Sequence, residues 1–205
     1  MNSRLNEIVL GTRNPGKLDE CSRLLAHLPV RWITLLDLGI ETTIHEVGET
    51  FSENAILKAK GYCDMTGRWA LADDSGLTVD ALGGRPGVHT SRYGGVGWTQ
   101  AEKWAALLRE LQSVAWKHRG AQFHCTIALA LPDQDHVFTA EGICRGRIAF
   151  SPAGDTGFGY DPIFYIPQYR CTMAQLPQHK KDSISHRSHA ARTMTSTISG
   201  LLAKR

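Results

Sequence analysis

Two neighbouring carboxylates, Asp73 and Asp74, directly follow the short apolar run 69–72. Carboxylates suit a hard cation such as Mg²⁺, which usually keeps several waters and bridges one or two acids to substrate phosphates. Successive side chains of a strand point to opposite faces, so at most one of the two acids can face a given site. Further acids lie upstream at Glu46, Glu49 and Glu53. The pattern fits a magnesium site, and it also fits a surface turn with two solvated acids.

The run Gly11 to Lys17 follows the phosphate-binding pattern G-x-x-x-x-G-K but fails at the next position. Leu18 stands where Ser or Thr would hold Mg²⁺, and Pro15 removes one of the backbone N–H donors that a P-loop uses. The run is therefore not a P-loop. Its predicted strand, loop and helix still place Lys17 and several N–H groups at a helix N-terminus, which attracts phosphate. An anion site and a plain strand-to-helix turn both remain open.

Two later segments also carry groups that could contact a ligand. The run Phe158-Gly159-Tyr160-Asp161 offers two aromatic rings and a carboxylate on a predicted loop, where a base could stack or the rings could fill the core. Four cations, Lys180, Lys181, His186 and Arg187, lie at or near the predicted start of the last helix. Positive charge is unfavourable at that end unless an anion or another partner compensates it. A ligand and ordinary solvated charge are the two interpretations.

The elements that must position these residues follow from hydrophobic periodicity and helix caps. Thr50 with Glu53 and Thr99 with Glu102 form two capping boxes, each ahead of an apolar stripe at helical spacing. The predicted strands cover residues 7–12, 30–35, 69–72, 77–79, 122–131, 136–144 and 145–150. The first predicted helix follows the turn at residues 13–16, and the others begin near residues 50, 99 and 185. Strands and helices alternate early, which favours parallel pairing, and short connections later favour antiparallel pairing. The fold class is therefore mixed α/β.

Composition bounds the remaining possibilities. The 205 residues are 42% hydrophobic, with a formal net charge of +3, which is typical of a globular protein and too weakly basic for a dedicated nucleic-acid binder. Neither a bilayer-spanning run nor an apolar leader in Met1 to Leu10 is present, so we expect a cytoplasmic protein without a membrane partner. Five cysteines without a C-x-x-C pair predict free thiols. With no linker or repeat, residues 1–205 are predicted to be a single domain with possible internal lobes.

An ordered set of motifs over about residues 7 to 200 resembles the inosine/xanthosine triphosphate pyrophosphatases. The motifs are Thr12-Arg13-Asn14-Pro15-Gly16-Lys17, Glu46-Val47-Gly48-Glu49-Thr50-Phe51 with Glu53-Asn54-Ala55, Ala72-Asp73-Asp74-Ser75-Gly76-Leu77, Pro86-Gly87-Val88-His89-Thr90-Ser91-Arg92-Tyr93, Phe158-Gly159-Tyr160-Asp161-Pro162 and Ser185-His186-Arg187. The resemblance implies a long mixed β-sheet flanked by helices, two lobes with a central nucleotide-binding cleft, and a homodimer. It also implies hydrolysis of dITP, ITP, XTP and dXTP to the monophosphate plus pyrophosphate, which cleanses the nucleotide pool.

The resemblance further implies a role for each motif. Asp74 is the catalytic carboxylate, which orients or deprotonates the attacking water and contacts Mg²⁺. The substrate-binding residues implied by similarity are Thr12, Arg13, Asn14, Pro15, Gly16 and Lys17 for the triphosphate, Ser75 and Lys181 for the nucleotide, Phe158, Gly159, Tyr160 and Asp161 for the base and sugar, and His186 and Arg187 for the base. A donor aimed at a 6-oxo group would meet another donor if adenine were bound, so adenine is rejected.

This sequence departs from the family pattern at two places. Many relatives carry two acids before the Gly-x-Thr-Phe segment, whereas His45 here precedes Glu46. Imidazole is a poorer magnesium ligand than carboxylate, so Glu46 takes the role, water fills it, or the preference has moved toward Mn²⁺. Arg13 replaces a glycine of many relatives, and either contacts a phosphate or faces solvent.

Two alternative functions stay open. A pyrophosphatase of the Maf type would share the architecture but favour other modified nucleotides. A nucleotide sensor would keep the cleft without hydrolysis, which the missing acid at His45 makes conceivable. Asp74 argues against the sensor, because without a metal its charge would repel the phosphates.

Overall fold

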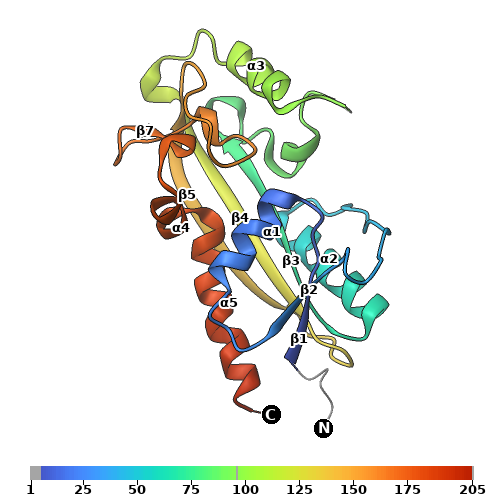
Figure 1. Ribbon diagram of the computed structural model, residues 1–205. Coiled ribbons are helices and arrows are strands. Elements are labelled where there is room, and N and C mark those ends of the chain that lie inside the picture. The colour runs from blue at the N-terminus through green and yellow to red at the C-terminus, as the bar shows by residue number, and fades with distance from the viewer. Residues whose placement is uncertain (1–5, 96, 205) are drawn as a thin grey trace. The chain divides into compact units, whose positions relative to one another are not determined.

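The computed structural model describes residues 6–95 and 97–204, so part of the Met1 to Leu10 segment lies outside the described residues. The protein has an α/β fold built on a seven-stranded sheet in the order β2-β1-β3-β4-β5-β6-β7, with helices packed along it (Figure 1). The strands are β1 (Glu7–Leu10), β2 (Arg31–Thr34), β3 (Trp69–Val79), β4 (Gly120–Ala130), β5 (Phe138–Ile148), β6 (Phe164–Ile166) and β7 (Cys171–Thr172). The prediction of a long mixed sheet flanked by helices is confirmed.

The chain divides into two compact units. Unit 1 comprises residues 6–74, 125–142 and 186–204, and unit 2 comprises Ser75–His124 and Ile143–Ser185. Three strands, β3, β4 and β5, contribute residues to both units. The cleft that the resemblance implies stays a prediction.

The parallel part of the sheet lies in unit 1. Val9 of β1 lies opposite Ile33 of β2 and Ala70 of β3, and both pairings are parallel. Parallel neighbours need crossover connections, which here contain helices α1 (Pro15–Leu24) and α2 (Phe51–Thr66). The core of unit 1 packs apolar side chains of these strands against α1, α2 and the last helix, α5 (His186–Leu202).

The antiparallel part continues through unit 2. Ile148 of β5 lies opposite Phe164 of β6, and Ile166 of β6 lies opposite Cys171 of β7, both in antiparallel pairs. Helix α3 (Gln100–Glu110) begins with the predicted capping box of Thr99 and Glu102, and α2 begins with that of Thr50 and Glu53. Both caps are confirmed because each depends on hydrogen bonds across only three residues.

Two strand predictions were wrong in the same way. The strands predicted at 69–72 and 77–79 are one strand, β3, which includes Asp73 to Gly76, and those predicted at 136–144 and 145–150 are one strand, β5. In β3 the acids are buried and paired with cations, so the strand does not have to break at charged residues. Sequence analysis also missed the short strands β6 and β7 and the helix α4 (Gln178–Ile184).

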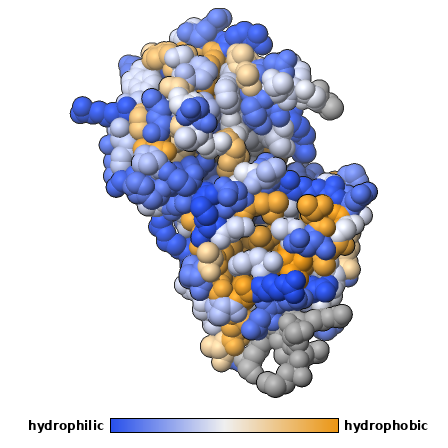
Figure 2. All heavy atoms as spheres, in the orientation of Figure 1, coloured by the Kyte–Doolittle hydropathy of each residue, from blue (hydrophilic) through white to orange (hydrophobic). Residues whose placement is uncertain are grey.

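The cysteines are free thiols, as predicted, since all five lie within the described residues and none is in a disulfide. Burial raises the pKa of Cys21 to about 12, so this thiol is not a nucleophile near neutral pH. On the face shown in Figure 2, hydrophilic and hydrophobic residues are interspersed. Within residues 6–95 and 97–204, no helix combines the length and the hydropathy needed to cross a bilayer.

Gly142 of β5 lets the strand approach the first turn of α5 within unit 1. A Cβ atom at this position would collide with the carbonyl oxygen of His186 and lie 2.5 Å from the backbone nitrogen of Ala190. Both neighbours are backbone atoms, so they can move only if the start of α5 moves. The close approach therefore sets where α5 begins.

We expect Gly142→Ala to lower the free energy of unfolding by about 1–3 kcal/mol, because the added methyl group overpacks two backbones. Urea denaturation measures this change. Gly200→Ala is the control, since Gly200 lies in α5 and a Cβ there meets no atom within 4 Å beyond its chain neighbours and its own helix backbone. The control should raise stability by about 0.5–1 kcal/mol, the usual gain for this change in a helix. Equal effects of the two substitutions would contradict the role of the close approach.

Candidate active site

The loop between β1 and α1 carries the predicted anion-binding residues of unit 1. Asn14 caps α1, and its Oδ1 accepts hydrogen bonds from the backbone nitrogens of Gly16 at 2.9 Å and Lys17 at 3.2 Å. Pro15 occupies the first turn of the helix. Two of the N–H groups that could bind a phosphate are therefore already satisfied by Asn14, and the Lys17 ammonium is the charged group that the loop presents.

Two further residues of this loop also have internal partners. The Thr12 hydroxyl accepts a hydrogen bond from the Asn14 backbone nitrogen at 3.3 Å. Arg13 donates to the carbonyl oxygen of Ile40 at 2.5 Å, which ties the loop to the segment after β2. Hydrogen bonds within the loop and to Ile40 thus hold the loop in place, so Lys17 follows it in an ordered first turn of α1.

The neighbouring acids of β3 have different partners, as strand alternation predicts. The Asp73 Oδ2 lies 3.0 Å from the Lys17 Nζ and accepts a hydrogen bond from the Arg187 Nη2 at 2.9 Å. The Asp74 Oδ1 accepts one from the Lys58 Nζ at 2.8 Å. The two carboxylates of unit 1 are therefore bonded to different cations, and Lys17 and Lys58 each also act electrostatically on the neighbouring acid.

Lys58 of α2 is a functional candidate that the sequence analysis missed. Its ammonium donates to Glu46 Oε1 at 2.6 Å as well as to Asp74, and the residue is 8% exposed. The signal was present in the sequence, because Lys58 shares helical spacing with the buried residues Ala55, Ala59 and Tyr62. A lysine within an apolar stripe needs an acidic partner, and here it has two.

These ion pairs shift the pKa values of their members in different directions. Burial raises the pKa of Asp74, and Lys58 only partly opposes this. Burial would also raise the pKa of Asp73, but Lys17 and Arg187 hold it well below its usual range. Burial would lower the pKa of Lys58, but Asp74, Asp73 and Glu46 raise it instead. Asp74 is therefore the more basic of the two neighbouring carboxylates, which suits it to accept a proton.

The same geometry bears on the candidate metal ligands. Glu46 and Asp74 each place an oxygen within 2.8 Å of one ammonium nitrogen, so the two carboxylates converge on a single cation. Two converging carboxylates fit a hard divalent ion that completes its shell with water and phosphate oxygens. Within the described ranges no group of three or more His, Cys, Asp or Glu side chains could hold a metal alone. His45 is exposed, whereas Glu46 is half-buried against Lys58.

The predicted nucleotide-binding loop of unit 2 is held by its own carboxylate. Asp161 Oδ2 accepts hydrogen bonds from the Lys181 Nζ at 2.5 Å and from the Phe158 backbone nitrogen at 2.9 Å. The Lys181 ammonium also lies 4.7 Å from the centre of the Phe158 ring. The Gly159 carbonyl accepts from the Trp104 indole at 2.8 Å. The loop is thus pre-ordered, with Phe158 half-buried and Lys181 as its cation.

Tyr160 and Ser75 complete the predicted set in unit 2. Tyr160 is buried in the core of this unit, where its hydroxyl donates to the Thr90 carbonyl at 3.2 Å. This placement matches the interpretation that an aromatic residue of the loop fills the core. Ser75 follows Asp74 in β3 and is half-buried.

The cations near the start of the last helix are compensated by protein carboxylates. Arg187 is buried in α5 and donates to Glu20 Oε2 at 2.6 Å and to Asp73. His186, the first residue of α5, is also buried. In unit 2, Lys181 is paired with Asp161. The charge pattern that pointed to a ligand therefore has an internal explanation for Arg187 and Lys181.

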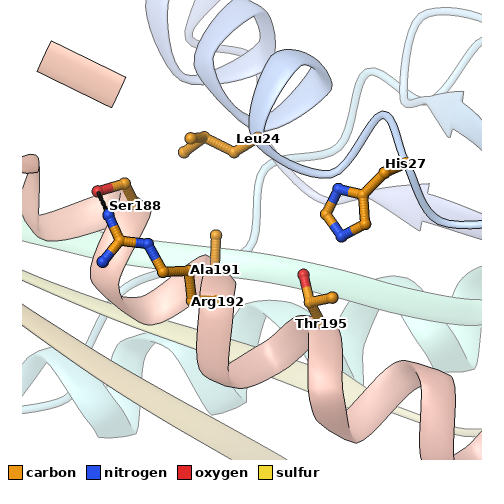
Figure 3. Close-up of a pocket in the computed structure, with 6 residues that line it drawn as sticks. All are labelled: Leu24, His27, Ser188, Ala191, Arg192 and Thr195. Carbon is orange, nitrogen blue, oxygen red and sulfur yellow. Dashed lines mark hydrogen bonds between the residues drawn. The ribbon is translucent and has the colours of Figure 1, made fainter. Parts of the chain in front are cut away.

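A cavity of about 240 Å³ lies between α1 and α5 in unit 1 (Figure 3). Leu24 and His27 line one side, and Ser188, Ala191, Arg192 and Thr195 of α5 line the other. Arg192 donates to the Ser188 hydroxyl at 3.4 Å, one turn away along α5. None of the predicted site residues lines this cavity, so it is not the candidate active site.

Comparisons with known proteins agree on one family. A model described as the Ham1 family matches residues 8–197. A dITP/XTP pyrophosphatase of Geobacillus kaustophilus is 47% identical over 91% of this chain and 91% of its own, and one of Yersinia pseudotuberculosis is 44% identical over 95% and 98%. A solved HAM1 protein from Coxiella burnetii superposes with a TM-score of 0.87 at 41% identity, covering 96% of this chain and 100% of its own.

Proposed function

The chain belongs to the Ham1 family, and from this membership and the acids and cations of unit 1 we propose that it hydrolyses deaminated purine nucleoside triphosphates. The substrates are dITP, ITP, XTP and dXTP, and the products are the monophosphate and pyrophosphate. The observation that carries the proposal is Asp74, a buried carboxylate with a raised pKa that shares Lys58 with Glu46. The biological role of the protein is to remove these nucleotides from the pool that polymerases use.

Asp74 has the central part in the reaction. Its carboxylate orients a water molecule and takes a proton from it as the water oxygen bonds to the α-phosphorus. The bond between the α-phosphorus and the bridging oxygen breaks, and pyrophosphate leaves with the electron pair. The Lys58 ammonium donates to Asp74 Oδ1 at 2.8 Å, which holds this buried carboxylate in a fixed orientation.

Positive charge around the phosphates comes from Lys17 and a divalent cation. Lys17 lies at the N-terminal turn of α1 and supplies a point charge, while Thr12 to Gly16 hold that turn in place. Glu46 and Asp74, whose oxygens contact the Lys58 ammonium in this structure, would hold Mg²⁺, with Mn²⁺ as an alternative. When bound, the metal ion neutralises charge that develops on the phosphate oxygens.

The base and sugar are recognised by the remaining residues of the set. Phe158 offers a ring for stacking, and Gly159 to Asp161 shape the loop around it with Lys181 and Ser75. His186 favours a 6-oxo purine over adenine, because a ring N–H donor opposes an exocyclic amino group. Arg187, which resemblance pairs with His186, is 1% exposed, and its guanidinium is held by Glu20 and Asp73 in the core rather than by the base. We also place the protein in the cytoplasm and expect it to be a homodimer. Sedimentation at several concentrations would test the oligomeric state.

A substrate panel tests the proposed function. Purified protein is incubated with dITP, XTP, dATP, dGTP and a modified pyrimidine triphosphate, first with Mg²⁺ and then with Mn²⁺, and both products are measured. Pyrophosphate release from dITP and XTP alone is the expected result. Preference for the pyrimidine would favour the Maf-type alternative, and tight binding without turnover would favour the sensor.

A second experiment tests whether Glu46 or His45 binds the metal ion. We expect Glu46→Gln to raise the Mg²⁺ concentration for half-maximal rate at least about tenfold, because one of two carboxylate ligands is lost. His45→Gln is the matched control, and its Mg²⁺ dependence should equal that of the unmodified protein, since His45 is exposed. A reversed pattern would assign the metal to His45.

A further inference from the structure

A buried chain of four charges runs through the core of unit 1 behind the candidate active site. Glu20 Oε2 accepts from Arg187 Nη1 at 2.6 Å, and Asp73 Oδ2 accepts from Arg187 Nη2 at 2.9 Å and Nε at 3.3 Å. The Lys17 Nζ lies 3.0 Å from the same Asp73 oxygen. Negative and positive groups alternate along the chain, so it links α1, α5 and β3 and returns to α1.

Only one member of this chain reaches solvent to a significant extent. The side chains of Glu20, Arg187 and Asp73 are each 1% exposed, whereas Lys17 is 15% exposed. Two acids and two cations make the cluster neutral overall. Buried charges are tolerated when they are paired, and removing one partner leaves an uncompensated charge that the interior must relieve.

Glu20 has no role in the proposed reaction. This residue lies in the middle of α1, one turn after Lys17, and its carboxylate holds the end of the Arg187 guanidinium that is remote from Asp73. We propose that Glu20 is a positioning residue for Lys17, acting through Arg187 and Asp73. The proposal rests on the proposed function, because it assigns Lys17 to the substrate phosphates.

The physical reason is the competition for one oxygen. Asp73 Oδ2 accepts hydrogen bonds from two of the three donor nitrogens of Arg187, Nε and Nη2, and also contacts the Lys17 ammonium. The charge of Glu20 balances Arg187, which leaves the charge of Asp73 to anchor Lys17. Without Glu20, Arg187 and Lys17 share Asp73 as the acid that both contact directly, and Lys17 is the cation that can relieve the excess because it is the more exposed of the two. Lys17 would then leave its ordered position beside the phosphates.

A double-mutant cycle tests this coupling. The variants are Glu20→Gln, Lys17→Met and the double variant, and kcat/KM for dITP is measured for each. Glu20→Gln should lower kcat/KM about tenfold in the unmodified background and leave it unchanged in the Lys17→Met background. A residue that merely supports the fold would lower the rate by the same factor in both backgrounds, and this result would overturn the proposal.

Conservative variants distinguish charge from packing. Glutamine has the shape of Glu20 without its charge, whereas aspartate keeps the charge on a shorter side chain, so Glu20→Asp should retain more activity than Glu20→Gln. The opposite order would show a packing role and contradict the proposal. Circular dichroism verifies folding, and if Glu20→Gln does not fold, the cycle is run with Glu20→Asp, whose smaller loss must also vanish in the Lys17→Met background.

Asp19→Asn is the matched control on the same helix. Asp19 adjoins Glu20 but is 73% exposed and paired with Arg23 one turn away at the surface. It should leave kcat/KM unchanged. If the unmodified protein did not hydrolyse dITP, the proposed function would fail. If the protein is active and the effects of Glu20→Gln and Lys17→Met are additive, only the positioning role of Glu20 is refuted.

Discussion

Asp74→Asn is expected to lower kcat for dITP by about 10³-fold or more, the largest loss among single substitutions in the candidate site. The substitution keeps the size of the side chain but removes both the base for the attacking water and a carboxylate ligand of the metal ion. Steady-state release of pyrophosphate measures the loss, with the products identified by chromatography.

Stability measurements separate this effect from unfolding. Lys58 keeps Glu46 as its partner when Asp74 is neutral, since the two form an ion pair at 2.6 Å. The free energy of unfolding of Asp74→Asn, measured in urea, should therefore stay close to that of the unmodified protein. Asp64→Asn, at an exposed position of α2, is the control that should retain full activity. Substantial turnover by a folded Asp74→Asn variant would remove Asp74 from its catalytic role.

Arg119→Met is expected to lower the free energy of unfolding by about 3–5 kcal/mol, the largest loss of stability that we predict. Arg119 is 1% exposed in unit 2 and donates to four backbone carbonyls, those of Leu111 at 2.7 Å, Ile148 at 2.7 Å, Ala149 at 2.9 Å and Val114 at 3.4 Å. The guanidinium thus joins the turn after α3 to the end of β5. Methionine fills similar space but leaves these acceptors without their buried donor.

Arg147→Met is the matched control for Arg119. Arg147 also belongs to unit 2 and donates to a backbone carbonyl, that of Trp116 at 3.1 Å, but its bond is exposed to solvent. Water can replace an exposed donor, so the control should lose less than about 1 kcal/mol. Urea denaturation of both variants gives the comparison, and an equally small loss for Arg119→Met would show that its hydrogen bonds contribute little.

The sequence by itself determined those features that depend on a few neighbouring residues. The capping boxes at Thr50 and Thr99 begin α2 and α3 as predicted, because their hydrogen bonds span only three residues. Strand alternation predicted that Asp73 and Asp74 would have separate surroundings. The ordered motifs predicted the family, which the comparisons confirm.

Only the tertiary structure decided how the charged groups are paired. Asp73 and Arg187 are 114 residues apart in the chain, and no local pattern indicates that they meet. The same holds for Lys58 between Glu46 and Asp74, and for the continuity of β3 through two acids that distant cations neutralise. Local hydrogen bonds and periodicity are set by adjacent residues, whereas the cost of burying a charge is decided by whichever partner the fold brings to it.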